Sequence, residues 1–176
     1  DVSQFGLIYA GAQKNIGPAG LTIVILRKEL IGHALDICPK MLNYQTHAEK
    51  GSMFNTPPTY AIYLAGLVFD WTLAHGGVTE MEKRNLAKAN LLYDYLDQSS
   101  RFEATVNAPH RSRMKVCFHL ESAEDDTRFL AFAEQHRLYF LKGHRSVGGM
   151  RASIYNPMPI EGVERLIEVM EAFVKA

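Results

Sequence analysis

Two short apolar runs near the start of the chain constrain its fold most. Residues 5–11 (FGLIYAG) contain glycine at position 6 and at their end, and residues 21–26 (LTIVIL) are continuous and rich in β-branched side chains. Each pattern is typical of a strand that is buried on both faces. Two such strands imply a larger sheet whose other strands come from elsewhere. We therefore expect this region to be part of a larger domain, as though the chain were cut from a longer protein.

Apolar periodicity predicts two long helices after these strands. The first covers residues 59–75 and is expected to be mostly buried, with Tyr60 and Tyr63 packed in its core. The glycine pair that follows should stop it. The second covers residues 78–99, has one apolar face, and is long enough to bridge two domains. A short helix is also expected near residues 30–34.

The last part of the chain reads as a compact α+β unit. The expected strands are residues 115–120, 138–142 and 150–155, and the expected helices are residues 123–136 and 159–176. The predicted organisation is therefore a partial large domain, an interdomain helix and a small C-terminal α+β domain, covering residues 1–77, 78–100 and 101–176.

Composition excludes several classes of function. The chain has 19 Lys plus Arg and 19 Asp plus Glu, so it has no net attraction to nucleic acid or to an anionic membrane. The basic cluster at residues 110–113 is expected to be a solvated loop. No apolar run of about 18 residues is present, so no membrane span is predicted. Cys38 and Cys117 are too far apart in sequence for a disulfide framework or a zinc motif, so we expect no metal site and free thiols in the cytoplasm.

Lys14 is the most informative single residue. It follows a predicted core strand and lies in the loop AGAQKNIGPAG, where small residues would let a flat ligand approach the backbone. A lysine in such a place is most often a surface residue with a partly buried stem. In an enzyme it could instead form a Schiff base with a carbonyl compound and move protons. The second role requires the amine to be buried beside an anion-binding cleft, and we expect to find it there.

Four segments carry a resemblance to a known family. They are AGAQKNIGPAG at 10–20, SMFNTPPT at 52–59, KGHR at 142–145 and GGMRASIYN at 148–156. Together, and in this order, they resemble the phosphoserine aminotransferases, pyridoxal-phosphate enzymes of class V and fold type I. The resemblance covers all 176 residues and roughly the second half of the family's chain. It implies an α/β fold: the end of the large mixed-sheet domain plus a small α+β C-terminal domain.

The resemblance implies a cofactor site that two chains share. Lys14 matches the lysine that binds pyridoxal phosphate covalently and then carries a proton between the substrate Cα and the cofactor. Gln13 matches a residue near the cofactor phosphate; otherwise it would be an ordinary loop amide. Asn55 and Thr56 match phosphate ligands that come from the neighbouring subunit, which makes a homodimer obligatory. From the residues alone, both could simply cap the following helix.

The resemblance also implies a substrate site. His144 and Arg145 match the pair that binds the substrate phosphate, and Arg151 matches the arginine that binds the substrate α-carboxylate. Taken alone, these residues would be ordinary surface cations. Their position around a Gly-Gly turn, before an apolar strand, favours a place in a cleft.

The implied reaction is transamination. Phosphohydroxypyruvate and glutamate would be interconverted with phosphoserine and 2-oxoglutarate in serine biosynthesis, and 4-phosphohydroxythreonine would be handled in pyridoxine biosynthesis. The family's aspartate, stacking aromatic ring and glycine-rich phosphate loop precede the cofactor lysine, so we expect the isolated 176 residues to be inactive. The alternative is a truncated, non-catalytic dimerisation module. A different fold type I aminotransferase is disfavoured, because a substrate without phosphate would not need His144 and Arg145.

Overall fold

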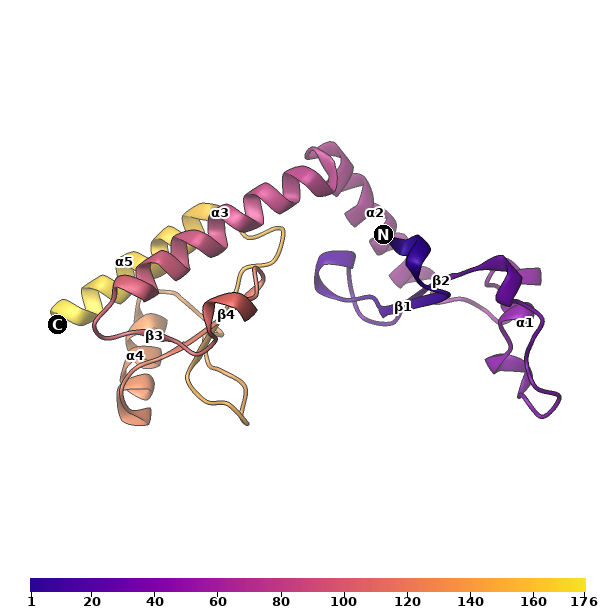
Figure 1. The fold of residues 1–176 in the computed structure, drawn as a ribbon. Coiled ribbons are helices and arrows are strands. Elements are labelled where there is room, and N and C mark those ends of the chain that lie inside the picture. Colours follow the sequence, from indigo (N-terminus) through magenta and orange to yellow (C-terminus); the bar gives the residue numbers. More distant parts are fainter. The chain divides into compact units, whose positions relative to one another are not determined.

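The structure, a computed structural model, describes residues 1–176 and divides into two compact units. Unit 1 is Asp1–Ala74 and unit 2 is His75–Ala176. Figure 1 shows the elements of each unit along the chain. No single helix combines the length and the apolar composition needed to cross a membrane.

Unit 1 is built on a β-hairpin and a long helix. Strands β1 and β2 are antiparallel, with Leu7 opposite Leu26 and Gly11 opposite Thr22. Both strands and the helix after residue 58 lie where the sequence predicts them, whereas the short helix expected near residues 30–34 is replaced by a one-turn 3-10 helix that ends at Leu30. The elements are η1 (Val2–Gln4), β1 (Leu7–Gly11), η2 (Lys14–Ile16), β2 (Thr22–Leu26), η3 (Lys28–Leu30), η4 (Lys40–Leu42), α1 (Tyr44–Glu49) and α2 (Thr59–Ala74).

Unit 1 by itself leaves much of its hairpin exposed, and the expectation that the helix at residues 59–75 is mostly buried is wrong. On the hairpin, Tyr9 and Ile25 are 75% and 51% exposed. On α2, Tyr60, Tyr63 and Leu73 are 72%, 63% and 72% exposed, so the two tyrosines are not core residues. The reason is that a two-stranded sheet and one long helix can cover only one side of each other. A strand pattern that calls for burial on both faces needs a further layer, which these 74 residues do not supply.

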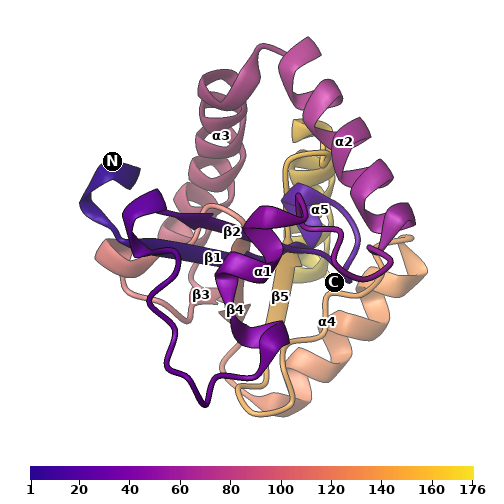
Figure 2. The same cartoon turned by 90° about the vertical axis from the view of Figure 1, so that its right-hand side faces the viewer.

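Unit 2 is a three-stranded antiparallel sheet with three long helices. The strand order is β3-β4-β5, so β4 is central and β5 is an edge strand. The predicted bounds of the three helices are confirmed to within a residue or two. The elements are α3 (Gly77–Gln98), β3 (Glu103–Ala104), η5 (Ala108–His110), β4 (Lys115–His119), α4 (Ala123–Gln135), β5 (Met150–Ser153) and α5 (Ile160–Lys175). Figure 2 labels the strands and the three long helices.

The expected strand at residues 138–142 is wrong. Only one isolated bridge forms there, between Lys142 and Met150. Arg137 and Phe140 have φ of 64° and 63°, in the left-handed region. A strand needs extended backbone, so two left-handed residues so close together prevent one.

The core of unit 2 lies between the sheet and its helices. Alternate residues of β4 and β5 point into it, and three buried rings, those of Phe102, Phe118 and Phe129, pack edge to face. Val116, Met150 and Ala152 share this core with side chains of α3, α4 and α5. Because side chains alternate along a strand, the residues between them lie on the face of the sheet turned away from the helices. That face carries the candidate substrate residue Arg151.

Candidate functional site

The Lys14 turn is a strained and well-fixed part of unit 1. Lys14 begins η2, directly after β1, and has φ of 58°, which is rare for a residue with a side chain. Such a conformation costs on the order of 1 kcal/mol and is typical of functional sites. The turn is closed by main-chain bonds from Ala12 N to Leu21 O at 2.7 Å, from Ile16 N to Gln13 O at 3.3 Å and from Gly17 N to Lys14 O at 3.1 Å.

Small residues hold this turn against α2. Ala12, Ala61 and Ala65 are 3%, 7% and 2% exposed. Gly17 has φ of 133°, a conformation that favours glycine, and it lies against the backbone of Ala65, where a Cβ would be 3.4 Å from the Ala65 Cα. The helix therefore fixes the backbone from which Lys14 projects.

The Lys14 side chain is exposed, and the expectation that its amine is buried within this chain is wrong. Gln13 is exposed as well. The cause is the one that exposes the hairpin: no other segment of unit 1 covers this side of it.

Asn55 and Thr56 are exposed residues just before α2. The first carbonyl of that helix to accept a bond is Pro58 O, from Ile62 N at 3.1 Å, so the helix begins after Pro58. Neither Asn55 nor Thr56 is therefore its N-cap, and the capping alternative is wrong. Asn55 Nδ2 lies 3.6 Å from the sulfur of Met41. The amide and hydroxyl groups of this pair are suited to bind a phosphate near a helix start.

In unit 2, His144 and Arg145 lie on a tight loop before β5. The loop is closed by a bond from Gly143 N to Gly149 O at 2.8 Å, and His144 O accepts bonds from Val147 N and Gly148 N at 2.9 Å. A Cβ at Gly143 would overlap the carbonyl oxygen of Gly148, so only glycine fits there. The loop exposes both cations.

Ser146 is a residue of this loop that the sequence did not single out. Its hydroxyl lies 2.7 Å from Nδ1 of His144, and its main-chain N lies 3.3 Å from the same atom. These contacts fix the imidazole through one nitrogen and leave the other for a ligand.

Arg151 is half-buried on β5, opposite Cys117 of β4. Its Nε atom is buried and has no hydrogen-bond partner. Arg151 is one of the residues that line a pocket of about 510 Å³. Most buried polar groups in proteins are paired, and an unpaired one costs about 1–3 kcal/mol. A planar carboxylate would supply the missing acceptor.

Two further polar residues are buried in unit 2, and the sequence analysis missed both. Asn85 and Lys88 are 4% and 2% exposed. Burial lowers the pKa of the Lys88 ammonium. Both lie on the buried face of α3, at helical spacing from Met81 and Leu92. That spacing was the available signal, because it puts a charge on an otherwise apolar stripe.

The two arginines of the basic cluster at residues 110–113 each pair with an acidic side chain. Arg111 forms two hydrogen bonds to Asp97, at 2.6 and 2.5 Å, and lies 4.5 Å from the centroid of the Tyr93 ring. The Arg111 hydrogen bond lowers the pKa of the Asp97 carboxyl. Arg113 pairs with Glu82 at 2.5 Å. Nowhere in the chain do three His, Cys, Asp or Glu side chains gather where they could hold a metal ion.

The candidate residues form two groups. Gln13, Lys14, Asn55 and Thr56 belong to unit 1, and the 144–151 segment belongs to unit 2. A sequence model of the family described as aminotransferase class-V matches residues 1–166. The chain belongs to the class-V aminotransferase family.

Two curated relatives show how much of such a protein the chain represents. The phosphoserine aminotransferase of Herminiimonas arsenicoxydans is 61% identical over 175 residues, 99% of this chain and 48% of that protein. The phosphoserine aminotransferase of Nitrosomonas europaea is 57% identical, over 99% of this chain and 48% of that protein. The chain thus spans about half the length of the curated relatives it matches.

Solved structures agree with the family assignment. The phosphoserine aminotransferase from Bacillus circulans subsp. alkalophilus matches with a TM-score of 0.93 at 45% identity, covering 98% of this chain and 48% of that one. A phosphoserine aminotransferase from Trichomonas vaginalis, described as bound to pyridoxal phosphate, matches with a TM-score of 0.88 at 37% identity, covering 97% of this chain and 49% of that one. The predicted fold, part of a fold type I α/β transferase, is confirmed.

Proposed function

We propose that this chain is part of a pyridoxal-phosphate-dependent phosphoserine aminotransferase. The proposed reaction interconverts 3-phosphohydroxypyruvate and glutamate with phosphoserine and 2-oxoglutarate, and it also serves the phosphorylated substrate of pyridoxine biosynthesis. The observation that carries the proposal is the buried, unpartnered Nε of Arg151 on the strand that follows the His144–Arg145 loop. One segment thus offers a carboxylate site next to two groups that suit a phosphate.

The residues of unit 1 fit the cofactor. Bound pyridoxal phosphate supplies an electron sink that stabilises negative charge at the substrate Cα. Lys14 offers a primary amine on a fixed turn, which can hold the cofactor covalently and later carry the proton to and from that carbon. The exposed donors of Gln13, Asn55 and Thr56 suit the cofactor phosphate. In this proposal Asn55 and Thr56 act in the neighbouring subunit's site.

In unit 2, the candidate cations divide between two parts of the substrate. Arg151 binds and orients the substrate carboxylate through its planar guanidinium. His144 and Arg145 bind the substrate phosphate, and the Ser146 contact holds the imidazole in place for it. Together they fix the Cα of the substrate, which is the atom at which Lys14 moves the proton.

The proposal extends to assembly, location and domains. The whole protein is a homodimer in the cytoplasm, a compartment that suits the two free thiols, Cys38 and Cys117. Residues 1–77 are part of the large cofactor domain, residues 78–100 form an interdomain helix, and residues 101–176 form the small domain.

Kinetics with two amino donors test the substrate assignment. The full-length enzyme should prefer phosphoserine to alanine, and Arg145→Met should reduce that preference about 100-fold, because a charge-assisted bond to phosphate is lost. The control is Arg113→Met, which removes a cation outside the loop that contains Arg145. It should leave the preference unchanged, because Arg113 is paired with Glu82. If Arg145→Met retained the wild-type preference, a phosphate-binding role for this loop would be wrong.

For the 176 residues alone, the exposed Lys14 supports a second candidate, a non-catalytic dimerisation module. Pyridoxal phosphate mixed with the isolated chain should then give no absorbance band that borohydride removes. A stable band that Lys14→Ala abolishes would instead show a competent cofactor site within these residues.

A further inference from the structure

Lys88 is a charged side chain buried in unit 2 without an acidic partner. It is 2% exposed and takes part in none of the ion pairs of the structure. Its Nζ donates to the carbonyl oxygens of Ile154, Tyr155 and Met158, at 3.1, 2.8 and 2.9 Å. An ammonium group has three donors, so these bonds use all of them. Only such charge-assisted bonds offset the cost of burying the charge.

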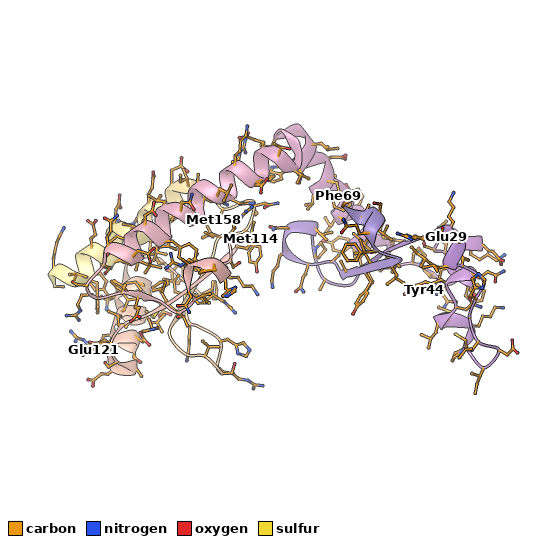
Figure 3. All side chains as sticks on the ribbon, in the orientation of Figure 1. Glu29, Tyr44, Phe69, Met114, Glu121 and Met158 are labelled. Carbon is orange, nitrogen blue, oxygen red and sulfur yellow. The ribbon has the colours of Figure 1, made fainter.

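The carbonyls that Lys88 binds belong to residues 154–158, which we call the 154–158 connection because they join β5 to α5. Pro157 lies within the connection, so that main-chain position offers no N–H, and Pro159 follows it directly. Asn85, three residues before Lys88 on α3, donates from Nδ2 to Oδ1 of Asn156 at 2.7 Å. Figure 3 shows Met158 beside α3. The helix therefore holds the connection through both side chains.

The 154–158 connection continues the strand that carries Arg151. β5 is an edge strand, with β4 paired on one side only. On its other side, near its start, it has the isolated bridge to Lys142 and a bond from Arg151 N to Leu141 O at 2.6 Å. At its end, Ile154 N donates to Met114 O at 3.0 Å, and Ile154 O accepts from Lys88. Lys88 thus fixes the first residue after this strand to a long helix, and Asn85 adds a contact two residues further on.

We propose that Lys88 is a positioning residue for Arg151. By binding the 154–158 connection it sets the position of β5 relative to α3, and so the direction of the guanidinium that receives the substrate carboxylate. A two-point grip on a carboxylate tolerates displacements of only about 0.5 Å. The inference rests on the proposed function, in which Arg151 is that carboxylate ligand. A role in stability alone would not change carboxylate affinity. A positioning role predicts that replacing Lys88 weakens carboxylate binding, and that it does so only while Arg151 is present.

The test uses the full-length holoenzyme and glutarate, a dicarboxylate that undergoes no transamination. Lys88→Met keeps the apolar stem and removes the charge. It should raise the glutarate dissociation constant, and the KM of both amino-acid substrates, about 10-fold, with kcat changed less than about 3-fold. The absorbance of the lysine-bound cofactor should not change. The matched control is Lys83→Met on the same helix, whose side chain is 71% exposed, and it should behave as wild type.

A double-variant cycle decides whether Lys88 acts through Arg151. In an Arg151→Met background, Lys88→Met should change glutarate binding less than about 2-fold. An equal effect in both backgrounds, or a lowered Tm with unchanged glutarate binding, would overturn the proposal. Should Lys88→Met not fold, Lys88→Gln, which is neutral but keeps amide donors, replaces it in the same cycle. A wild-type holoenzyme that binds no glutarate and does not transaminate would refute the proposed function, and this inference with it.

Discussion

Arg151 shows how the role of a residue depends on the face of a strand that it occupies. Its neighbours Met150 and Ala152 are 1% and 3% exposed in the core, so the alternation of side chains puts Arg151 on the other face. There its Nε is buried without a partner. The guanidinium of Arg111, by comparison, donates two hydrogen bonds to Asp97. Arg111 therefore stabilises the fold, whereas the Nε of Arg151 can still donate to a ligand.

Replacing Arg151 should weaken carboxylate binding in both half-reactions. In Arg151→Lys the charge remains but the planar two-point contact is lost, which should cost about 1.5–3 kcal/mol. Steady-state kinetics should therefore show KM raised at least about 10-fold for glutamate and for phosphoserine alike. A defect confined to phosphoserine would mean that Arg151 binds the phosphate instead.

Lys88 should make stability depend on pH in the alkaline range. Its pKa is lowered in the folded protein, so between that value and the ordinary value of 10.5 the unfolded chain binds more protons. The free energy of unfolding of wild type, minus that of Lys88→Met, should therefore rise with pH there, by at most about 1.4 kcal/mol per pH unit. Urea unfolding at several pH values measures the difference. A difference that falls or stays flat would contradict the burial of this charge.

At the level of elements, the loop before β5 depends on backbone geometry more than on side chains. Its closure brings Gly143 so near Gly148 that no Cβ fits between them. The loop is short and directly precedes β5, so a change at Gly143 moves His144 and Arg145. A position that must be glycine for the loop to close can therefore affect binding by the neighbouring side chains, although glycine itself has none.

Gly143→Ala should therefore impair phosphate binding without unfolding the protein. We expect KM for phosphoserine to rise about 10-fold or more, since the loop must open to place the new methyl group. Gly66→Ala is the control: it lies within α2, where a Cβ would meet nothing within 4 Å, and it should be neutral or stabilise by up to about 1 kcal/mol. Equal kinetics for the two variants would contradict the account of the loop.

The elements that the sequence predicted well are those whose signal is local. The amphipathic patterns of α3, α4 and α5 placed their ends within a residue or two, because each helix has one buried face within unit 2. The strand expected at residues 138–142 failed, because nothing in the side chains of Arg137 and Phe140 signals left-handed backbone. The spacing of Lys88 on α3 signalled its burial, but its three acceptors are main-chain atoms far away in the sequence, and no side-chain pattern identifies them.

At the scale of the whole molecule, the two units differ in how complete they are. Unit 2 has a closed core built from a sheet and three helices. Unit 1 exposes apolar side chains on both its hairpin and α2, Tyr9 and Leu73 among them. Burying these side chains requires a further layer that unit 1 does not supply, and the chain spans about half the length of its relatives. The motifs that carry the candidate residues are local, so the sequence could name these residues, but it could not predict the exposure of Lys14.

Mixing two inactive variants should restore activity if the active site is shared between subunits. A heterodimer of Lys14→Ala and Asn55→Ala chains contains one site in which both residues are intact. Random mixing makes half the dimers of this kind, so about a quarter of wild-type activity should return. Mixtures that stay inactive after subunit exchange would place Asn55 and Lys14 of the same chain in one site.

The central claim is that the Lys14 amine holds the cofactor. Reduction of the full-length holoenzyme with borohydride, followed by proteolysis and peptide mass measurement, tests it directly. The account predicts that the pyridoxyl phosphate mass is attached to the peptide containing Lys14, and that Lys14→Ala loses both this adduct and the visible absorbance band. Attachment to any other lysine, or transamination at the wild-type rate by Lys14→Ala, would contradict it.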